Sequence, residues 1–168
     1  MTERNPTRKP VESFDLACFE LAGQAYAVPI AHVREILATP AITPLPDAPA
    51  VIEGVIDLRG TLIPVLDLVS LLAREGTARG PRSRTVVVEA RGFVVGFRVD
   101  RATQVVSASR EAMEPLPALT REAGCLVVGS VVRQHDRPPI LVLDLDVLID
   151  RVRAASEPTE QLGDGVAA

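Results

Sequence analysis

Two aspartates are the first candidates for chemistry, because each stands in the same Leu-Asp-Leu sequence. Asp67 follows the apolar run Ile63–Leu66, and Asp144 follows the similar run Ile140–Leu143. Two carboxylates from related segments could share a proton, as they do in aspartic proteases. Neither, however, is followed by the small residue and glycine of such a catalytic loop. Each ends a predicted strand just before a helical run, where a carboxylate accepts from free N–H groups, so we predict that both are structural helix caps.

Other residues that could do chemistry lack the partners that the chemistry needs. His32 and His135 are the only histidines, and neither has an HxxE, HxxxH or CxxC neighbour that would indicate a metal site. Cys18 and Cys125 stand singly in apolar runs, as small buried side chains do. No GK[ST] follows the glycines at 54 and 60, and no nucleophile elbow is present. The sequence therefore predicts a protein without catalytic residues, metal or cofactor.

Composition argues against a polyanionic partner. The 168 residues are 47% hydrophobic and carry a net charge of −4, with a pI near 5.2. Nucleic-acid binders concentrate Lys and Arg to displace counterions, and they supply aromatic rings for stacking, whereas aromatics are only 3% of this chain. The N-terminus lacks the apolar region of a signal peptide, and no run reaches the roughly 18 apolar residues of a membrane span. We expect a cytoplasmic protein.

An internal repeat divides the chain into two similar parts. Glu20-Leu21-Ala22-Gly23 aligns with Glu89-Ala90-Arg91-Gly92, and Ile63–Leu68 aligns with Ile140–Leu145 in the same order. The chain therefore divides into two similar halves, at about 13–75 and 84–153, joined by a linker at about 75–83, with strands possibly exchanged between them. Together the halves form one domain at 13–153. We expect disordered tails at 1–12 and 154–168.

Alternating apolar residues and turn residues predict four hairpins. The strand pairs are Phe14–Leu21 with Tyr26–Ile30, Val51–Leu58 with Thr61–Leu66, Arg84–Ala90 with Phe93–Val99, and Leu126–His135 with Ile140–Leu143. In the same order, the expected turns are Gly23-Gln24, Arg59-Gly60, Arg91-Gly92 and Asp136-Arg137-Pro138. We predict short helices at Ala31–Leu37, Leu68–Arg74 and Val147–Val152, and an extended loop at Pro40–Pro49, which contains four prolines. Short strands with regularly spaced turns are typical of small closed barrels.

One segment carries a family resemblance. Gly54-Val55-Ile56-Asp57-Leu58-Arg59-Gly60, followed by Ile63-Pro64-Val65-Leu66-Asp67-Leu68, resembles the signature of CheW, the adaptor of bacterial chemotaxis. Val33-Arg34-Glu35-Ile36 is similar to the short helix of that family, Val94–Asp100 to its second-half hairpin, and Ile140–Leu145 to its last strand. The resemblance covers about residues 14–150. The sequence departs from the family at Asp57, where Asn is usual, and at Ala27, where Gly is common.

The resemblance implies an all-β fold of two SH3-like five-stranded β-barrels packed on a shared hydrophobic core, with a few short helices. It implies a non-catalytic adaptor that couples a CheA-type histidine kinase, through the CheW-like regulatory domain of the kinase, to the cytoplasmic tips of chemoreceptors in membrane-associated arrays. The receptor groove of the family maps onto six residues here: Val33, Glu35, Gly54, Arg59, Gly60 and Val86. Asp57 would add negative charge beside Arg59 and so alter the choice of partner without disturbing the fold.

Three alternatives remain open at this stage. A CheW-like adaptor of a non-flagellar chemosensory pathway, such as twitching, surface sensing or development, would have the same fold and a different receptor. A small-barrel RNA-binding module is disfavoured by the acidic balance and by the shortage of aromatic residues. An enzyme that uses Asp67 and Asp144 is the least favoured of the three.

Overall fold

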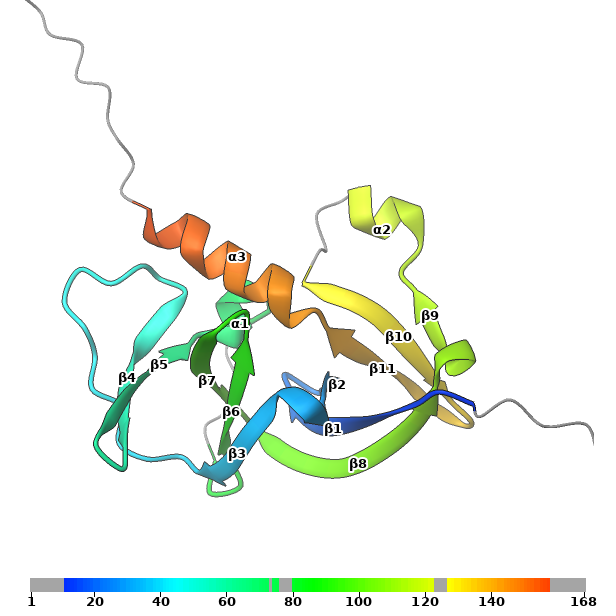
Figure 1. The fold of residues 1–168 in the computed structure, drawn as a ribbon, viewed down its shortest axis with the longest axis horizontal. Coiled ribbons are helices and arrows are strands. Elements are labelled where there is room, and N and C mark those ends of the chain that lie inside the picture. Colours follow the sequence, from blue (N-terminus) through cyan, green and yellow to red (C-terminus); the bar gives the residue numbers. More distant parts are fainter. Residues whose placement is uncertain (1–10, 73, 76–79, 123–126, 158–168) are drawn as a thin grey trace, which may run out of the picture.

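The computed structural model describes residues 11–72, 74–75, 80–122 and 127–157, which form two curved sheets and a few short helices (Figure 1). One sheet contains, in spatial order, β8 (Arg101–Ser109), β1 (Ser13–Leu21), β2 (Gln24–Pro29), β11 (Arg137–Leu143), β10 (Val128–Gln134) and β9 (Met113–Pro115). The other contains β3 (Val33–Ala38), β6 (Arg84–Ala90), β7 (Phe93–Val99), β5 (Thr61–Leu66) and β4 (Ile52–Leu58). The predicted fold class is therefore confirmed. One sheet has a sixth strand, the short β9.

The helices are short, as predicted, and most of them follow a strand directly. They are α1 (Leu68–Leu71), α2 (Ala118–Glu122) and α3 (Leu145–Ser156), with single 3-10 turns at η1 (Ile30–His32) and η2 (Arg110–Ala112). The last helix continues past the predicted end at Val152, because Arg and Ala residues there are good helix formers. The chain at 154–156 is therefore helical rather than part of a disordered tail.

The turns of three of the four hairpins share one geometry. Arg59-Gly60 and Arg91-Gly92 form the expected turns, with positive φ at both residues of each pair. Two central residues of positive φ define the type I′ turn, whose twist matches that of the strands. The predicted turn at Gly23-Gln24 was wrong by one residue, because Ala22 and Gly23 have φ of 51° and 74° and Gln24 already pairs with Leu21.

The hairpin of β10 and β11 also turns earlier than predicted. Gln134 pairs with Arg137, so the two-residue loop is His135-Asp136 rather than Asp136-Arg137-Pro138. Asp136 has a φ of 56°, a conformation that Asp tolerates better than most residues. The sequence suggested a longer loop because of its prolines, but Pro138 and the residue after it lie inside β11.

Each sheet combines one hairpin from each half of the repeat. The β1–β2 hairpin joins the β10–β11 hairpin through a parallel pairing, in which Ala27 lies opposite Val142. The β6–β7 hairpin joins the β4–β5 hairpin in the same way, with Gly96 opposite Val65. These are corresponding positions of the repeat. Strands far apart in the sequence therefore meet, and neither sheet can form from one half of the chain alone.

A single apolar cluster lies between the two sheets and under the helices. Phe19 of the first sheet and Phe97 of the second have ring centroids 5.5 Å apart, and both are almost fully buried. Leu68 of α1 and Leu148 of α3 belong to the same cluster. Smaller clusters fill each sheet separately, around Leu16 in one and Ile56 and its neighbours in the other. The structure thus shows the shared core that the fold class requires.

The predicted helix at Ala31–Leu37 was wrong. Only the 3-10 turn η1 forms there, and Val33–Ala38 is the strand β3, which pairs antiparallel with β6. The β-branched residues Val33 and Ile36 favour an extended backbone, and Ile36 lies opposite Val86 on the neighbouring strand. A partner strand from the other half of the repeat therefore overrides a weak helical periodicity.

Several predictions concern residues outside the described part of the chain. They are the tails at 1–10 and 158–168, part of the linker at 76–79, Cys125, and Leu126 at the start of a predicted strand. Within the described ranges, no helix has the length and apolar character to cross a membrane. The same ranges hold no group of three His, Cys, Asp or Glu side chains placed to bind a metal ion.

Candidate functional site

The β4–β5 hairpin ends in a turn that presents one cationic side chain. Asp57 accepts a hydrogen bond through Oδ1 from the backbone N–H of Gly60, at 2.8 Å, and so closes the turn around Arg59. The side-chain oxygen of Asn could accept the same bond, since both residues favour such local turns. Asp57 therefore preserves the turn. It also places a carboxylate two residues from the Arg59 guanidinium.

Arg59, in the turn after one edge strand of the five-stranded sheet, forms an ion pair with Glu35 on the other edge strand. Its Nη2 lies 2.8 Å from Oε1 and 2.7 Å from Oε2 of Glu35, which stands on β3. The arginine side chain is 74% exposed and the glutamate side chain 31%. Because β3 and β4 are the two edges of this sheet, the ion pair links elements that share no ladder. The charge-assisted contact orients Arg59 at the surface.

The positive φ of Arg59 has a structural cause. Its φ of 51° is rare for a residue with a Cβ, and such strain can mark a functional site. Ala22 and Arg91 have the same φ at the same position of their own turns. The hairpin geometry thus explains the conformation of all three residues. What distinguishes Arg59 is its exposed side chain and its carboxylate partner.

Two of the six predicted contact residues are buried. Val86 is 1% exposed and belongs to the shared core, so its side chain cannot reach a partner. Gly54 is buried where the chain at Thr43 crosses β4, and a Cβ there would lie 2.8 Å from Cγ2 of Ile42 and 2.9 Å from the carbonyl carbon of Thr43. Both residues therefore shape the sheet beneath the site. Family resemblance alone does not reveal this structural role, because contact residues and structural residues can both match the pattern of a family.

The remaining predicted residues are accessible to different degrees. Gly60 is exposed beside Arg59, and Glu35 is partly exposed on β3. Val33 begins β3 and is half-buried, because it packs against the shared core. The structure thus brings Glu35, Arg59 and Gly60 together at one surface, with Val33 at the base of the same strand as Glu35.

Two exposed apolar residues near this surface were missed. Leu62 of β5 lies opposite Asp57 in the ladder and is 68% exposed, and Ile36 follows Glu35 on β3 and is 42% exposed. Strand alternation could have identified Leu62, since Ile63 and Val65 point inward on either side of Pro64. Ile36 was hidden by the incorrect helix. An exposed arginine with exposed aliphatic side chains on β3 and β5 is suited to contact another protein.

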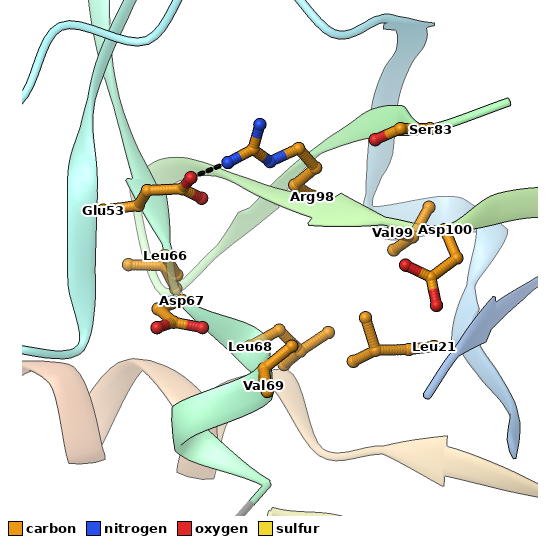
Figure 2. A pocket seen from close by; sticks show the side chains of 10 residues that line it. All are labelled: Leu21, Glu53, Leu66, Asp67, Leu68, Val69, Ser83, Arg98, Val99 and Asp100. Carbon is orange, nitrogen blue, oxygen red and sulfur yellow. Dashed lines mark ion pairs between the residues drawn. The ribbon is translucent and has the colours of Figure 1, made fainter. Parts of the chain in front are cut away.

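A polar pocket lies between α1 and the two sheets, and its groups are already engaged (Figure 2). Arg98 forms an ion pair with Glu53, and burial lowers the pKa of this arginine. Asp100 accepts from the backbone N–H of Ala22 at 3.0 Å, while Asp67 caps α1. The cavity measures about 30 Å³, whereas pockets for small-molecule ligands measure about 300 Å³ or more. The pocket is therefore too small for a substrate.

The repeated aspartates hold helix N-termini. Asp67 accepts from the backbone N–H and the hydroxyl of Ser70, at 3.2 and 2.7 Å. Asp144 accepts from the N–H of Val147 at 3.1 Å. Each carboxylate is therefore bound to its own helix, α1 or α3, and this accounts for the Leu-Asp-Leu sequence in both halves.

The histidines and the described cysteine show no sign of a shared site. His32 contacts the carbonyl oxygen of Glu89 through Nδ1 at 2.9 Å, while the side chain of His135 is 97% exposed on a hairpin turn. Cys18 is buried without a disulfide, and burial raises the pKa of its thiol. A thiol of raised pKa is a poor nucleophile at neutral pH.

Comparison with known proteins assigns nearly all of the described chain to one protein family. The family model described as CheW-like domain matches residues 15–153. A probable chemotaxis protein CheW of Rhizobium etli is 32% identical over 140 residues, which are 83% of this chain and 90% of the relative. Protein FrzA of Myxococcus xanthus is 29% identical over 136 residues, covering 81% of this chain and 85% of FrzA.

A solved structure agrees with the sequence comparisons. The crystal structure of the scaffolding protein TtCheW from Thermoanaerobacter tengcongensis superimposes with a TM-score of 0.72 and is 29% identical. The match covers 79% of this chain and 90% of that protein. It therefore includes both sheets and the shared core between them.

Proposed function

The chain belongs to the CheW-like domain family of chemotaxis signal-transduction adaptors, and we propose that it couples a CheA-type histidine kinase to the cytoplasmic tips of chemoreceptors. The proposal assigns no catalytic step to the protein. Its role is to hold two partners in one assembly at the membrane, where the receptors are. The partners and the array location are expectations from the family.

One observation supports the receptor contact above the others. Arg59 is exposed on a rigid two-residue turn, and Glu35 orients it through both carboxylate oxygens. Both contacts use Nη2, and within the described residues no hydrogen bond engages the other guanidinium nitrogens. An arginine held in this way can donate to a carboxylate or a carbonyl on a helical partner without losing much side-chain entropy on binding.

The exposed aliphatic residues near Arg59 supply the apolar part of the proposed receptor contact. Leu62 lies opposite Asp57 on β5, Ile36 follows Glu35 on β3, and burial of either exposed side chain in an interface is favourable. A central arginine surrounded by apolar contacts that exclude water is the usual arrangement of a binding hot spot. We therefore place the receptor tip over the Arg59–Glu35 pair.

The test compares two surface ion pairs of similar exposure. Arg59→Ala should weaken binding of a receptor-tip fragment about thirty-fold, the effect of losing roughly 2 kcal/mol at a hot spot. Arg133→Ala is the control, because Arg133 is 78% exposed and pairs with Glu114 on the other sheet. Both variants should melt near the wild-type temperature, since exposed substitutions change stability by about 0.5 kcal/mol or less.

The measurement is calorimetric titration of each variant with the receptor fragment, beside a titration with the regulatory domain of the kinase. Equal receptor affinity for wild type and Arg59→Ala would remove Arg59 from the site. Failure of the wild-type chain to bind either partner would overturn the proposed function as a whole.

An RNA-binding role fits the structure poorly. Phe19, Phe97 and Tyr26 are buried in the core, and Arg153 lies over the ring of Phe93 at 5.8 Å. Single-stranded nucleic acid is bound on exposed aromatic platforms within basic grooves, and this chain has a net charge of −4.

An adaptor of another chemosensory pathway is the second candidate. The similarity to FrzA, at 29% identity, nearly equals the similarity to the CheW of Rhizobium etli, at 32%. Titration against every CheA-type kinase encoded in the same genome distinguishes the pathways, because the physiological kinase should bind most tightly.

A further inference from the structure

Four strands form the edges of the two sheets, and three of these edges are protected against pairing with another chain. On β3, Arg34 and Glu35 form ion pairs with Glu89 and Arg59. The edge of β4 is covered by the chain at Thr43, which exchanges two hydrogen bonds of 2.9 Å with Val55. The strand β9 has only three residues and ends in a proline. Charges, covering segments, short length and proline are the devices by which edge strands avoid association.

The fourth edge, β8, lacks these protections from residue 102 to residue 109. It is nine residues long, and its residues from 102 to 109 include no charged residue and no proline. Val105 is 59% exposed, and Thr103, Gln104 and Ser107 are exposed beside it. No strand in the described part of the chain pairs with its outer edge, and Figure 1 shows β8 at the rim of its sheet. Such an edge can accept an additional strand.

The ladder with β1 indicates which backbone groups face outward. The N–H of Arg110 donates to the carbonyl oxygen of Glu12, and the register then continues without a shift to the pairing of Val105 with Ala17. In an antiparallel ladder, residues alternate between bonding their partner strand and directing N–H and C=O away from it. Val105 and Ser107 therefore direct their N–H and C=O groups to the open edge.

We propose that β8 pairs with β8 of a second copy of this chain, antiparallel and about a two-fold axis near Val106. In this register Val105 of each copy lies opposite Ser107 of the other, and their four N–H groups find four carbonyl acceptors. The uncharged stretch brings no like charges together along the pairing. A symmetric pairing of this kind closes on itself and produces a dimer rather than a filament.

Charge at the two ends of β8 favours a second copy as the occupant. The proposed register places Arg101 of each copy at the end where β8 of the other copy continues into η2, whose second residue is Glu111. Arg101 donates to Glu20 through Nη2 at 2.6 Å, and its remaining N–H groups can bind a second carboxylate. A strand from an unrelated protein would match both ends only by chance.

The predicted association is weak, because pairing one edge strand buries little surface. It becomes significant where many copies are held close together, as in an assembly. The surface lies on the six-stranded sheet, whereas Arg59 and Glu35 lie on the five-stranded one. Self-association and receptor binding can therefore be tested separately.

The first test is sedimentation equilibrium of the full chain over a range of concentrations. Val105→Lys places two ammonium groups near each other across the axis and should raise the dimer dissociation constant about tenfold. Leu119→Lys is the matched control, because Leu119 is 78% exposed on α2 and the substitution changes charge equally. Thermal melting of both variants verifies that each remains folded.

The second test uses the two-fold symmetry. Arg101→Glu and Glu111→Arg should each dissociate the dimer, since each places two pairs of like charges at the interface. An equimolar mixture of the two variants should restore it, because every contact in the mixed dimer is again between opposite charges. A wild-type chain that stays monomeric at about 1 mM overturns the proposal. So does equal behaviour of Val105→Lys and Leu119→Lys, or a mixture that fails to associate.

Discussion

Substitution of Gly54 tests whether this residue of the signature is a contact or a support. In Gly54→Ala the new Cβ would meet the carbonyl oxygen of Thr43, and it would lie 2.8 Å from Cγ2 of Ile42. The backbone at Thr43 cannot move freely, because its N–H and C=O exchange hydrogen bonds with Val55. Relief of the overlap therefore requires the loss of this bridge.

The magnitude follows from the bonds that must break. Two backbone hydrogen bonds contribute about 1 kcal/mol each, and displacement of the half-buried Ile42 from its cluster adds to this. We expect Gly54→Ala to destabilise the protein by about 2 to 3 kcal/mol, which lowers the melting temperature of a chain of this size by about 5 to 10 °C.

The assay is thermal unfolding followed by circular dichroism, with Gly80→Ala as the control. A Cβ on Gly80 would meet no atom within 4 Å, so that variant should melt like the wild type. Receptor affinity of the folded Gly54→Ala protein, measured well below its melting temperature, should fall less than that of Arg59→Ala. An unchanged melting temperature together with lost receptor binding would falsify the structural role and make Gly54 a contact residue.

Three further predictions concern the repeat and the core. Asp144→Ala should lose on the order of 1 kcal/mol in urea unfolding while Asp144→Ser loses little, because Ser also caps helices; equal losses would contradict the capping account. A fragment of residues 84–153 should show no cooperative melting transition, since both of its hairpins pair with hairpins of the first half, and an independent transition would refute the shared core. In a Cys125→Ser background, Cys18 should react slowly with a thiol reagent until urea unfolds the protein. Burial raises the pKa of the folded Cys18 thiol, so above pH 9.0 the unfolded thiol loses its proton more readily than the folded one. The free energy of unfolding should therefore fall as pH rises above 9.0. A free energy of unfolding that does not depend on pH in this range would contradict the effect of Cys18.

Much of the local structure was predictable from residues close together in the sequence. The turns at Arg59-Gly60 and Arg91-Gly92 follow from a glycine between alternating apolar runs, and the caps at Asp67 and Asp144 follow from an aspartate before a helical run. The other two turns were predicted one residue late, and the second of them was also predicted one residue too long. These errors arose because register is set by the strands on both sides of a turn as well as by the turn residues.

The candidate site was only partly predictable, because the signature does not separate exposed residues from buried ones. Arg59 and Glu35 are 24 residues apart and were assigned to the same surface by resemblance, and the structure shows them in direct contact. Val86 and Gly54 were assigned to the same surface by the resemblance but are buried. Leu62, which is 68% exposed, was not predicted because it lies between the two parts of the signature, which end at Gly60 and resume at Ile63.

The internal repeat, the hairpins and the aliphatic core follow from local patterns, since they depend on alternation and turn chemistry within short segments. The extended conformation of Val33–Ala38 depends on the fold as a whole, because the hydrogen-bonding partner of that strand is β6, about 50 residues away, and the fold determines this pairing. The fold also determines that each sheet draws one hairpin from each half. Local propensity cannot choose between pairing within a half and pairing across halves, because equivalent strands of a repeat present nearly the same apolar faces. The choice is made by the Phe19–Phe97 contact and the rest of the core that both sheets share.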